Sequence, residues 1–198
     1  MKIDHSVPLE YSTEENKNRI FGFWVFLGAE IVMFSTLFAV YFTLWNRTGN
    51  GPTAKEIFEI GPVLIETFLL LTSSFTIGLA INSMRQGLMK ATMGFFAVTL
   101  LLGLGFLGVE IYEFVTYVNE GATLQTNAFM SSLFTLLGLH GAHVTLGLVW
   151  GGGLMLQMKR EGFTPDTANK SFIFSLYWHF LDVVWIFIFS FVYLKGLM

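Results

Sequence analysis

Five long apolar windows constrain the fold of this chain more than any other feature of its sequence. They cover residues 20–45, 62–84, 91–117, 128–157 and 171–194. A helix needs about 20 mostly apolar residues to cross the hydrocarbon core of a bilayer, and each window is long enough. Pro62 lies in a first helical turn, where its missing N–H costs little. The sequence therefore predicts an all-α integral membrane protein, a bundle of five transmembrane helices.

The composition favours lipid as the main partner. Only 13% of the 198 residues are charged and 54% are hydrophobic, whereas soluble domains carry about 25% charged residues. This composition excludes a soluble globular enzyme. The absence of cysteine excludes disulfides, cysteine-ligated zinc, iron–sulfur clusters and thiol catalysis. A net charge of -3 without any long basic run argues against nucleic acid as a partner.

The charged residues between the windows predict the orientation of the chain. Residues 1–19 are polar and of mixed charge, unlike a cleavable signal peptide, so we expect a tail followed by a membrane domain at 20–198. Most of the 11 basic residues share one side with the tail: Lys2, Lys17, Arg19, Arg85, Lys90, Lys159, Arg160 and Lys170. The positive-inside rule then predicts a cytoplasmic N-terminus and an extracellular C-terminus. Four aromatic residues near window ends are expected at the membrane interfaces: Trp24, Trp45, Tyr117 and Tyr193.

Ionisable side chains inside the windows are the candidate functional residues. No lysine or arginine falls inside a window, yet these acids and histidines do: Glu30, Glu66, Glu110, Glu113, His140, His143, His179 and Asp182. Each would be costly facing lipid, so each is expected to face protein, water or a partner. Six of them form pairs spaced three residues apart, which places each pair on one helix face.

These residue types do not favour a metal or haem site in this chain. Carboxylate-bridged di-iron bundles repeat Glu-x-x-His, whereas the pairs here are Glu-x-x-Glu, His-x-x-His and His-x-x-Asp. A bis-histidine haem would need His179 together with His140 or His143. The structural alternative is that the polar groups bond to one another across helices. In that case His179 and Asp182 pair with each other, or with the acids of the 91–117 window.

Glu30 differs from the other candidates because it lies well inside the first window. No basic residue of any window can neutralise it, so a carboxylate there needs water or a partner. Its possible roles are proton handling, contact with another subunit, or a structural bond. Glycines indicate where helices pack closely: Gly103, Gly105, Gly108, Gly147, Gly151 and Gly153.

Four stretches, in order along the chain, resemble subunit III of the haem–copper terminal oxidases. They are GFWVFLGAE at 22–30, GLGFLGVEIYEF at 103–114, GLHGAHVTLG at 138–147 and SLYWHFLDVVWIF at 175–187. The resemblance covers nearly the whole chain from about residue 20 onward. Because several independent motifs occur in register, the resemblance is far more specific than any one of them.

The resemblance implies a non-catalytic subunit of an oxygen-reducing oxidoreductase in a bacterial cell membrane. In that family, subunits I and II hold the haems and coppers, reduce oxygen and pump protons. Subunit III binds no redox cofactor, packs against subunit I, supports its stability and proton uptake, and holds phospholipid in a cleft that also gives access to oxygen. Glu30 matches the family's carbodiimide-reactive glutamate. The remaining candidates are assigned to a polar inter-helix network: Glu66, Glu110, Glu113, His140, His143, His179 and Asp182.

The resemblance also implies partners for this chain. The longest family members have seven helices, the first two splayed to form the lipid cleft, whereas five are predicted here. The other wall of the cleft is then expected from helices of subunit I or from a small subunit IV. The segment VPLEYSTEE at 7–15 resembles the leader of subunit III in quinol oxidases of Gram-positive bacteria, which favours quinol over cytochrome c as electron donor. The alternatives are a small proton-coupled transporter and a dihaem membrane cytochrome.

Overall fold

Five long helices build the protein, as the computed structural model shows for residues 6–49 and 51–197. They are α1 (Glu14–Leu44), α3 (Ile60–Arg85), α4 (Met89–Asn119), α5 (Ala128–Glu161) and α6 (Pro165–Ile188). Each is long and apolar enough to cross a membrane when α6 is taken with the segments that continue it. Residues 1–5 of the predicted tail, Lys2 among them, and also Asn50 and Met198, lie outside the described residues. The predicted bundle of five helices is confirmed.

Short helical segments flank the long ones. They are η1 (Leu9–Tyr11), α2 (Ala54–Ile57), η2 (Phe189–Leu194) and α7 (Lys195–Leu197). η2 is a π-helical stretch that continues α6 and was not expected from the apolar pattern. Each predicted window lies within its helix except that the first overshoots by Trp45, the C-terminal cap of α1, and the last runs into η2.

Local capping explains why two helices begin before their apolar windows. The Thr13 side chain accepts a hydrogen bond from the backbone N–H of Asn16 at 3.2 Å, so α1 begins inside the predicted polar tail. α6 begins with Pro165 at its first position and with a capping box between Thr164 and Thr167. α5 ends where Gly162 adopts φ 71°, a left-handed conformation that favours glycine.

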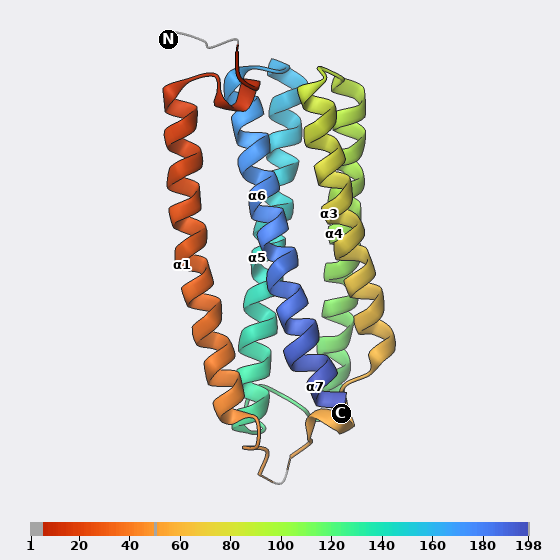
Figure 1. Ribbon diagram of the computed structural model, residues 1–198. Helices are drawn as coiled ribbons and strands as arrows, with labels where there is room; N and C mark the ends of the chain where they lie inside the picture. The colour runs from red at the N-terminus through yellow and green to blue at the C-terminus, as the bar shows by residue number, and fades with distance from the viewer. Residues whose placement is uncertain (1–5, 50, 198) are drawn as a thin grey trace.

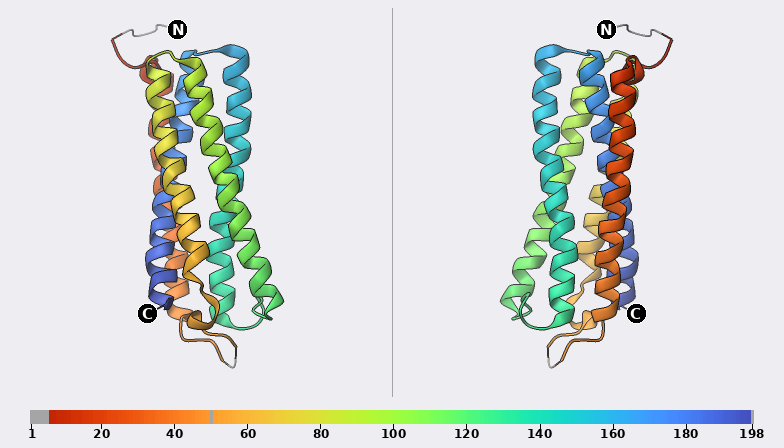
Figure 2. Two further views of the ribbon diagram at one scale, coloured as in Figure 1. Left: turned by 90° about the vertical axis from the view of Figure 1, so that its right-hand side faces the viewer. Right: turned by 90° about the vertical axis from the view of Figure 1, so that its left-hand side faces the viewer.

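α6 is the central helix of the bundle and contacts α1, α3 and α5 (Figure 1). α3 and α4 form a closely packed hairpin on one side of it, and α4 also contacts α5. α1 lies at the opposite edge, against α5 and α6, as the two side views in Figure 2 show. α1 begins at one end of the bundle and α6 and η2 finish at the other.

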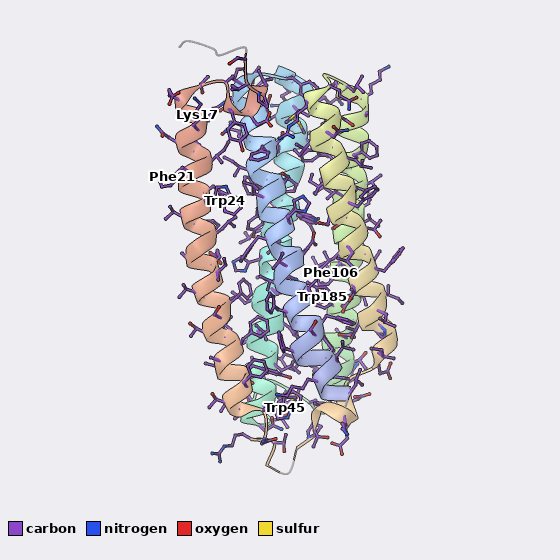
Figure 3. The ribbon with its side chains drawn as sticks, viewed as in Figure 1. Lys17, Phe21, Trp24, Trp45, Phe106 and Trp185 are labelled. Atoms are coloured by element: carbon purple, nitrogen blue, oxygen red, sulfur yellow. The ribbon has the colours of Figure 1, made fainter. Side chains whose placement is uncertain are left out.

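Two tryptophans of α6 form hydrogen bonds with hydroxyl groups of α3. Trp178 Nε1 donates to Ser73 Oγ at 2.9 Å, and Trp185 Nε1 donates to Thr67 Oγ1 at 3.0 Å. Trp185 also packs edge-on against Phe106 of α4 at a centroid distance of 4.8 Å (Figure 3). These contacts fix the rotation of α6 relative to the α3–α4 hairpin, because each satisfies a buried indole N–H.

The glycines of α4 and α5 make room for aromatic rings of α6. A Cβ on Gly103 would lie 2.7 Å from Cη2 of Trp178, and one on Gly147 would lie 3.0 Å from Cζ3 of the same ring. A Cβ on Gly151 would lie 2.8 Å from Cζ of Phe174. Gly103, Gly147 and Gly151 therefore lie in packed seams as expected, although they receive side chains rather than bring two backbones together. The expectation is wrong for Gly108 and Gly153, where an added Cβ would meet nothing within 4 Å.

The expected interfacial aromatics divide into two groups. Trp24 of α1 is 57% exposed. Tyr117 and Tyr193 are 4% and 1% exposed, so their side chains face the inside of the bundle rather than its surface. Both hydroxyls point instead toward a buried carboxyl group, that of Glu113.

Candidate functional site

Glu30 and His143 meet between α1 and α5. Glu30 Oε2 lies 3.3 Å from His143 Nε2, and the two side chains are 14% and 13% exposed. His143 Nδ1 lies 2.7 Å from the carbonyl oxygen of Leu139, so Nδ1 carries hydrogen and donates to it. Glu30 Oε2 is nevertheless buried without a hydrogen-bond partner among the described residues, so this contact is a close approach of acid and imidazole rather than a hydrogen bond. The pair therefore brings an acid and an imidazole together between two helices of the bundle.

His140, one turn away on α5, lies in an aromatic enclosure. Its ring stacks on Trp185 at 5.5 Å and meets Phe106 edge-on at 5.7 Å. The side chain is fully buried, and neither ring nitrogen has a hydrogen-bond partner among the residues that the structure describes. Such a ring is neutral, because a buried cation needs a partner.

Three glutamates form an acid cluster, defined as Glu66 of α3 with Glu110 and Glu113 of α4. Glu66 and Glu110 lie within electrostatic range of Glu113, and all three are buried. Glu113 Oε2 accepts hydrogen bonds from Tyr193 at 3.0 Å and from Tyr117 at 3.5 Å. Neither oxygen of Glu66 bonds to any described residue.

Glu110 reaches across to α5 because residue 141 is glycine. A Cβ on Gly141 would lie 3.0 Å from the Glu110 carboxyl carbon, so no larger residue fits there without displacing the acid. Gly141 follows His140 directly in the chain. The acid cluster therefore extends from the α3–α4 hairpin to the histidine-bearing helix.

His179 and Asp182 do not bond as the sequence suggested. His179 Nδ1 lies 2.7 Å from Ser74 Oγ on α3, so the histidine pairs with a hydroxyl group rather than an acid. Asp182 is 4% exposed, and its two oxygens lack hydrogen-bond partners in the described part of the chain. Helical spacing placed these residues on one face, and both side chains lie near Ser74, which bonds the histidine.

A further polar group, which sequence reasoning missed, ties the helix ends together. We call it the N-terminal cap, made of Glu10, Asn16, Arg85 and Asn169. Glu10 Oε1 accepts from Arg85 Nε at 2.8 Å and Arg85 Nη2 at 2.7 Å. Asn169 Nδ2 donates to the backbone oxygens of Glu10 at 2.9 Å and Asn16 at 3.1 Å. The cap links η1, α1, α3 and α6.

The N-terminal cap left no signal in the sequence because its members are distant along the chain. Glu10 and Arg85 are 75 positions apart, and Asn169 is 159 positions from Glu10. The Glu10 side chain is fully buried, whereas that of Arg85 is 45% exposed. Burial, together with the nearby Glu10 carboxylate, raises the pKa of the Tyr11 hydroxyl.

Within residues 6–49 and 51–197, no three acid or histidine side chains converge as a metal site would require. The ionisable side chains inside the bundle gather at two places, the Glu30–His143 pair on the α1 side and the acid cluster on the α3–α4 side. The two sites are separated by α5 and its buried His140.

Comparison with known proteins gives a consistent family. The family model described as "Cytochrome c oxidase subunit III" matches residues 10–197. "Quinol oxidase subunit 3" of Bacillus subtilis is 58% identical over 192 residues, which is 97% of this chain and 94% of the relative. "Probable quinol oxidase subunit 3" of Staphylococcus saprophyticus is 51% identical over 100% of this chain and 98% of the relative. "Cytochrome c oxidase subunit 3" of Bacillus sp. strain PS3 is 48% identical over 97% and 93%.

Proposed function

This chain belongs to the cytochrome c oxidase subunit III family, and from that premise we propose that it is subunit III of a bacterial quinol oxidase. The observation that carries the choice of quinol is the similarity, over nearly the whole chain, to relatives named quinol oxidase subunit 3. The leader at 7–15 supports the same choice. The family match favours the oxidase over the transporter and the dihaem cytochrome.

The chain is a membrane-embedded accessory subunit of an oxygen-reducing complex. The haems and coppers of such an oxidase are expected in subunits I and II, which would be its partners together with a small subunit IV. Exposed apolar side chains on α1, α3 and α4 supply surface for those subunits and for phospholipid. The part played by this chain is then support of subunit I and of its proton uptake.

The orientation follows from charge, with the N-terminus in the cytoplasm and the C-terminus outside. The described basic residues at the end where α1 begins are Lys17, Arg19, Arg85, Lys90, Lys159, Arg160 and Lys170, against Arg47, Lys55 and Lys195 at the other end. Such an excess marks the cytoplasmic side of a membrane protein. Labelling of cysteines introduced at Lys90 and Lys55 by a membrane-impermeant reagent, in intact cells, tests the orientation. Reaction at Lys90 instead of Lys55 would reverse it.

Glu30 and His143 are the residues through which this chain would handle a proton. Their side chains approach to 3.3 Å, in a contact that joins α1 to the rest of the bundle. Glu30→Gln removes the acid while keeping the shape of the side chain. We expect assembly of the complex to persist and proton uptake, or the number of turnovers before inactivation, to fall. Unchanged values of both would leave Glu30 a packing role.

The main test is purification of the complex in mild detergent through a tag on this chain. Haem and copper on co-purifying larger chains, with oxygen uptake driven by quinol, are the expected result. Oxygen uptake driven by reduced cytochrome c but not by quinol would correct the donor and keep the subunit assignment. A tagged chain that arrives alone and without haem would contradict the assignment.

A further inference from the structure

The acid cluster has no part in the proposed function of the subunit, although all three of its carboxyl groups are buried. Glu66 is 0% exposed, and its two oxygens find no hydrogen-bond donor in residues 6–49 and 51–197. Three carboxylates this close in an apolar interior would repel one another and lack hydration. The cluster must therefore hold protons to persist.

A small cavity leads from the cluster toward the end of the bundle at which α4 finishes. Its volume is about 60 Å³, and Glu113 and Tyr117 form its inner wall. Glu56, Glu59 and Glu120 line it farther out and are exposed to solvent. About 10–15 Å³ of such volume is enough to hold one water molecule, so the cavity can admit water. Glu113 thus belongs to both the buried cluster and the cavity.

We propose that Glu66, Glu110 and Glu113 form a proton store that exchanges protons with water through this cavity, at the end of the bundle opposite the N-terminal cap. Exchange begins at Glu113, whose O–H bond breaks as its proton passes to a water molecule in the cavity. The carboxylate left behind is stabilised by the hydroxyl groups of Tyr193 and Tyr117. A proton from Glu66 or Glu110 then moves to Glu113. That donor is reprotonated by the reverse path, in which Glu113 returns a proton to it and takes up a new proton from water.

The surroundings of the cluster suit a store that holds protons rather than a metal cation. The titratable groups facing it are Tyr117 on α4, Tyr193 on η2, and Glu59 just before α3. On the α5 side the next titratable group is His140, which precedes Gly141, the glycine that the Glu110 carboxyl group contacts. None of these groups supplies a fixed positive charge, since the histidine is enclosed by aromatic rings. Neutral acids therefore satisfy the site best.

The test is infrared difference spectroscopy of the purified complex in H₂O and D₂O, following the C=O stretch of protonated carboxylic acids. We expect a band at neutral pH that shifts in D₂O and that loses intensity in Glu66→Gln. The matched control is Glu120→Gln, an exposed acid at the outer part of the same cavity, which should leave the band unchanged. The haem spectrum of the same sample reports separately on the oxidase assignment.

A second variant tests the cavity without touching a buried acid. Thr116 lines the cavity, and Thr116→Phe would fill it. We expect the same carboxylic acid band with deuterium exchange slowed several-fold. Thr135→Phe, at an exposed threonine of α5, is the control and should exchange at the native rate.

Three results would overturn the proposal. They are the absence of a protonated band assignable to Glu66, a band that never shifts in D₂O, and equal exchange rates in Thr116→Phe and the native complex. If Glu66→Gln fails to assemble, Glu66→Asp serves instead, because it keeps the acid and should move the band rather than remove it.

Discussion

The N-terminal cap and the acid cluster are both buried polar groups, but they satisfy their atoms differently. In the cap each of the four side chains has at least one hydrogen bond, and the buried Glu10 is paired with Arg85. In the cluster Glu66 bonds to no described residue, whereas Glu113 accepts a hydrogen bond from Tyr193. The cap's hydrogen bonds hold four elements together, although Glu10 Oε2 and Asn169 Oδ1 have no partner among the described residues. The cluster's groups remain able to bind something else, and the least costly ligand is a proton.

The largest effect is expected where a charge would be stranded. Arg85→Met removes the partner of the fully buried Glu10 and should destabilise the chain by about 3 kcal/mol, as breaking a buried ion pair does. The apparent melting temperature of the purified complex measures it. Adding Glu10→Met in the same chain should recover part of the loss, because no charge is then left unpaired. A single variant as stable as the native protein would remove the cap as a stabilising feature.

The second largest effect on stability is expected from overpacking a glycine, which changes the space available and not a charge. Gly141→Ala places a methyl group against the Glu110 carboxyl group, and overpacking of this kind costs about 2 kcal/mol. The control is Gly138→Ala on the same helix, where a Cβ meets nothing within 4 Å. Thermal unfolding of the two variants should separate them clearly. Equal stability would mean that Glu110 moves aside without cost.

A smaller effect, of opposite sign, is expected for the acid cluster itself. Glu66→Met replaces an unpartnered carboxyl group by an apolar side chain of similar size and should stabilise the fold by about 1 kcal/mol. Glu10→Met in the cap should instead destabilise, because it gives up the bonds to Arg85. If both substitutions destabilise equally, then the contrast between the two regions fails.

The smallest effect concerns Glu56, an exposed acid at the mouth of the cavity. Its carboxylate accepts from the Thr53 backbone N–H at 2.7 Å, which lowers the pKa of Glu56 below its usual 4.5. The capping of α2 is then fully present above the usual pKa and is lost as pH falls through the lowered one. Deuterium exchange of residues 51–58 should differ between the native chain and Glu56→Ala at neutral pH. The difference should vanish in acid.

The helices of this fold could be predicted from the sequence because the signal for a membrane span is local. Length and apolar composition decide whether a segment such as α3 crosses a bilayer, whatever it packs against. The cap residues that extend α1 and α6 beyond their apolar windows can be found in the sequence. They are a weaker signal for helix boundaries than hydropathy. The π-helical stretch η2 depends on packing at the end of α6, so the apolar pattern gave no sign of it.

The candidate site was predictable as a set of residues but not as a set of contacts. Ionisable side chains are energetically costly in a bilayer, which identified Glu66, Glu110 and Glu113 as candidates. The structure places them together. Spacing along one helix could not show that His179 would turn to Ser74, or that Tyr193 would reach Glu113, because these depend on the rotation of two helices. The Glu10–Arg85 pair could not be predicted from the sequence either, because it also depends on how distant elements pack.

The position of α1 has a consequence for how the chain is made. α1 packs against α5 and α6, which are the last helices to be synthesised. About 120 residues separate Leu44 from Pro165, which corresponds to roughly 6–24 s of translation. During that interval the first span lies in the bilayer without its partner helices, and Glu30 lacks its contact with His143. Its apolar stretch is more hydropathic than that of α5, which enters when its neighbours are already present. The first span therefore has to pass the membrane insertion machinery alone while carrying an unpaired acid.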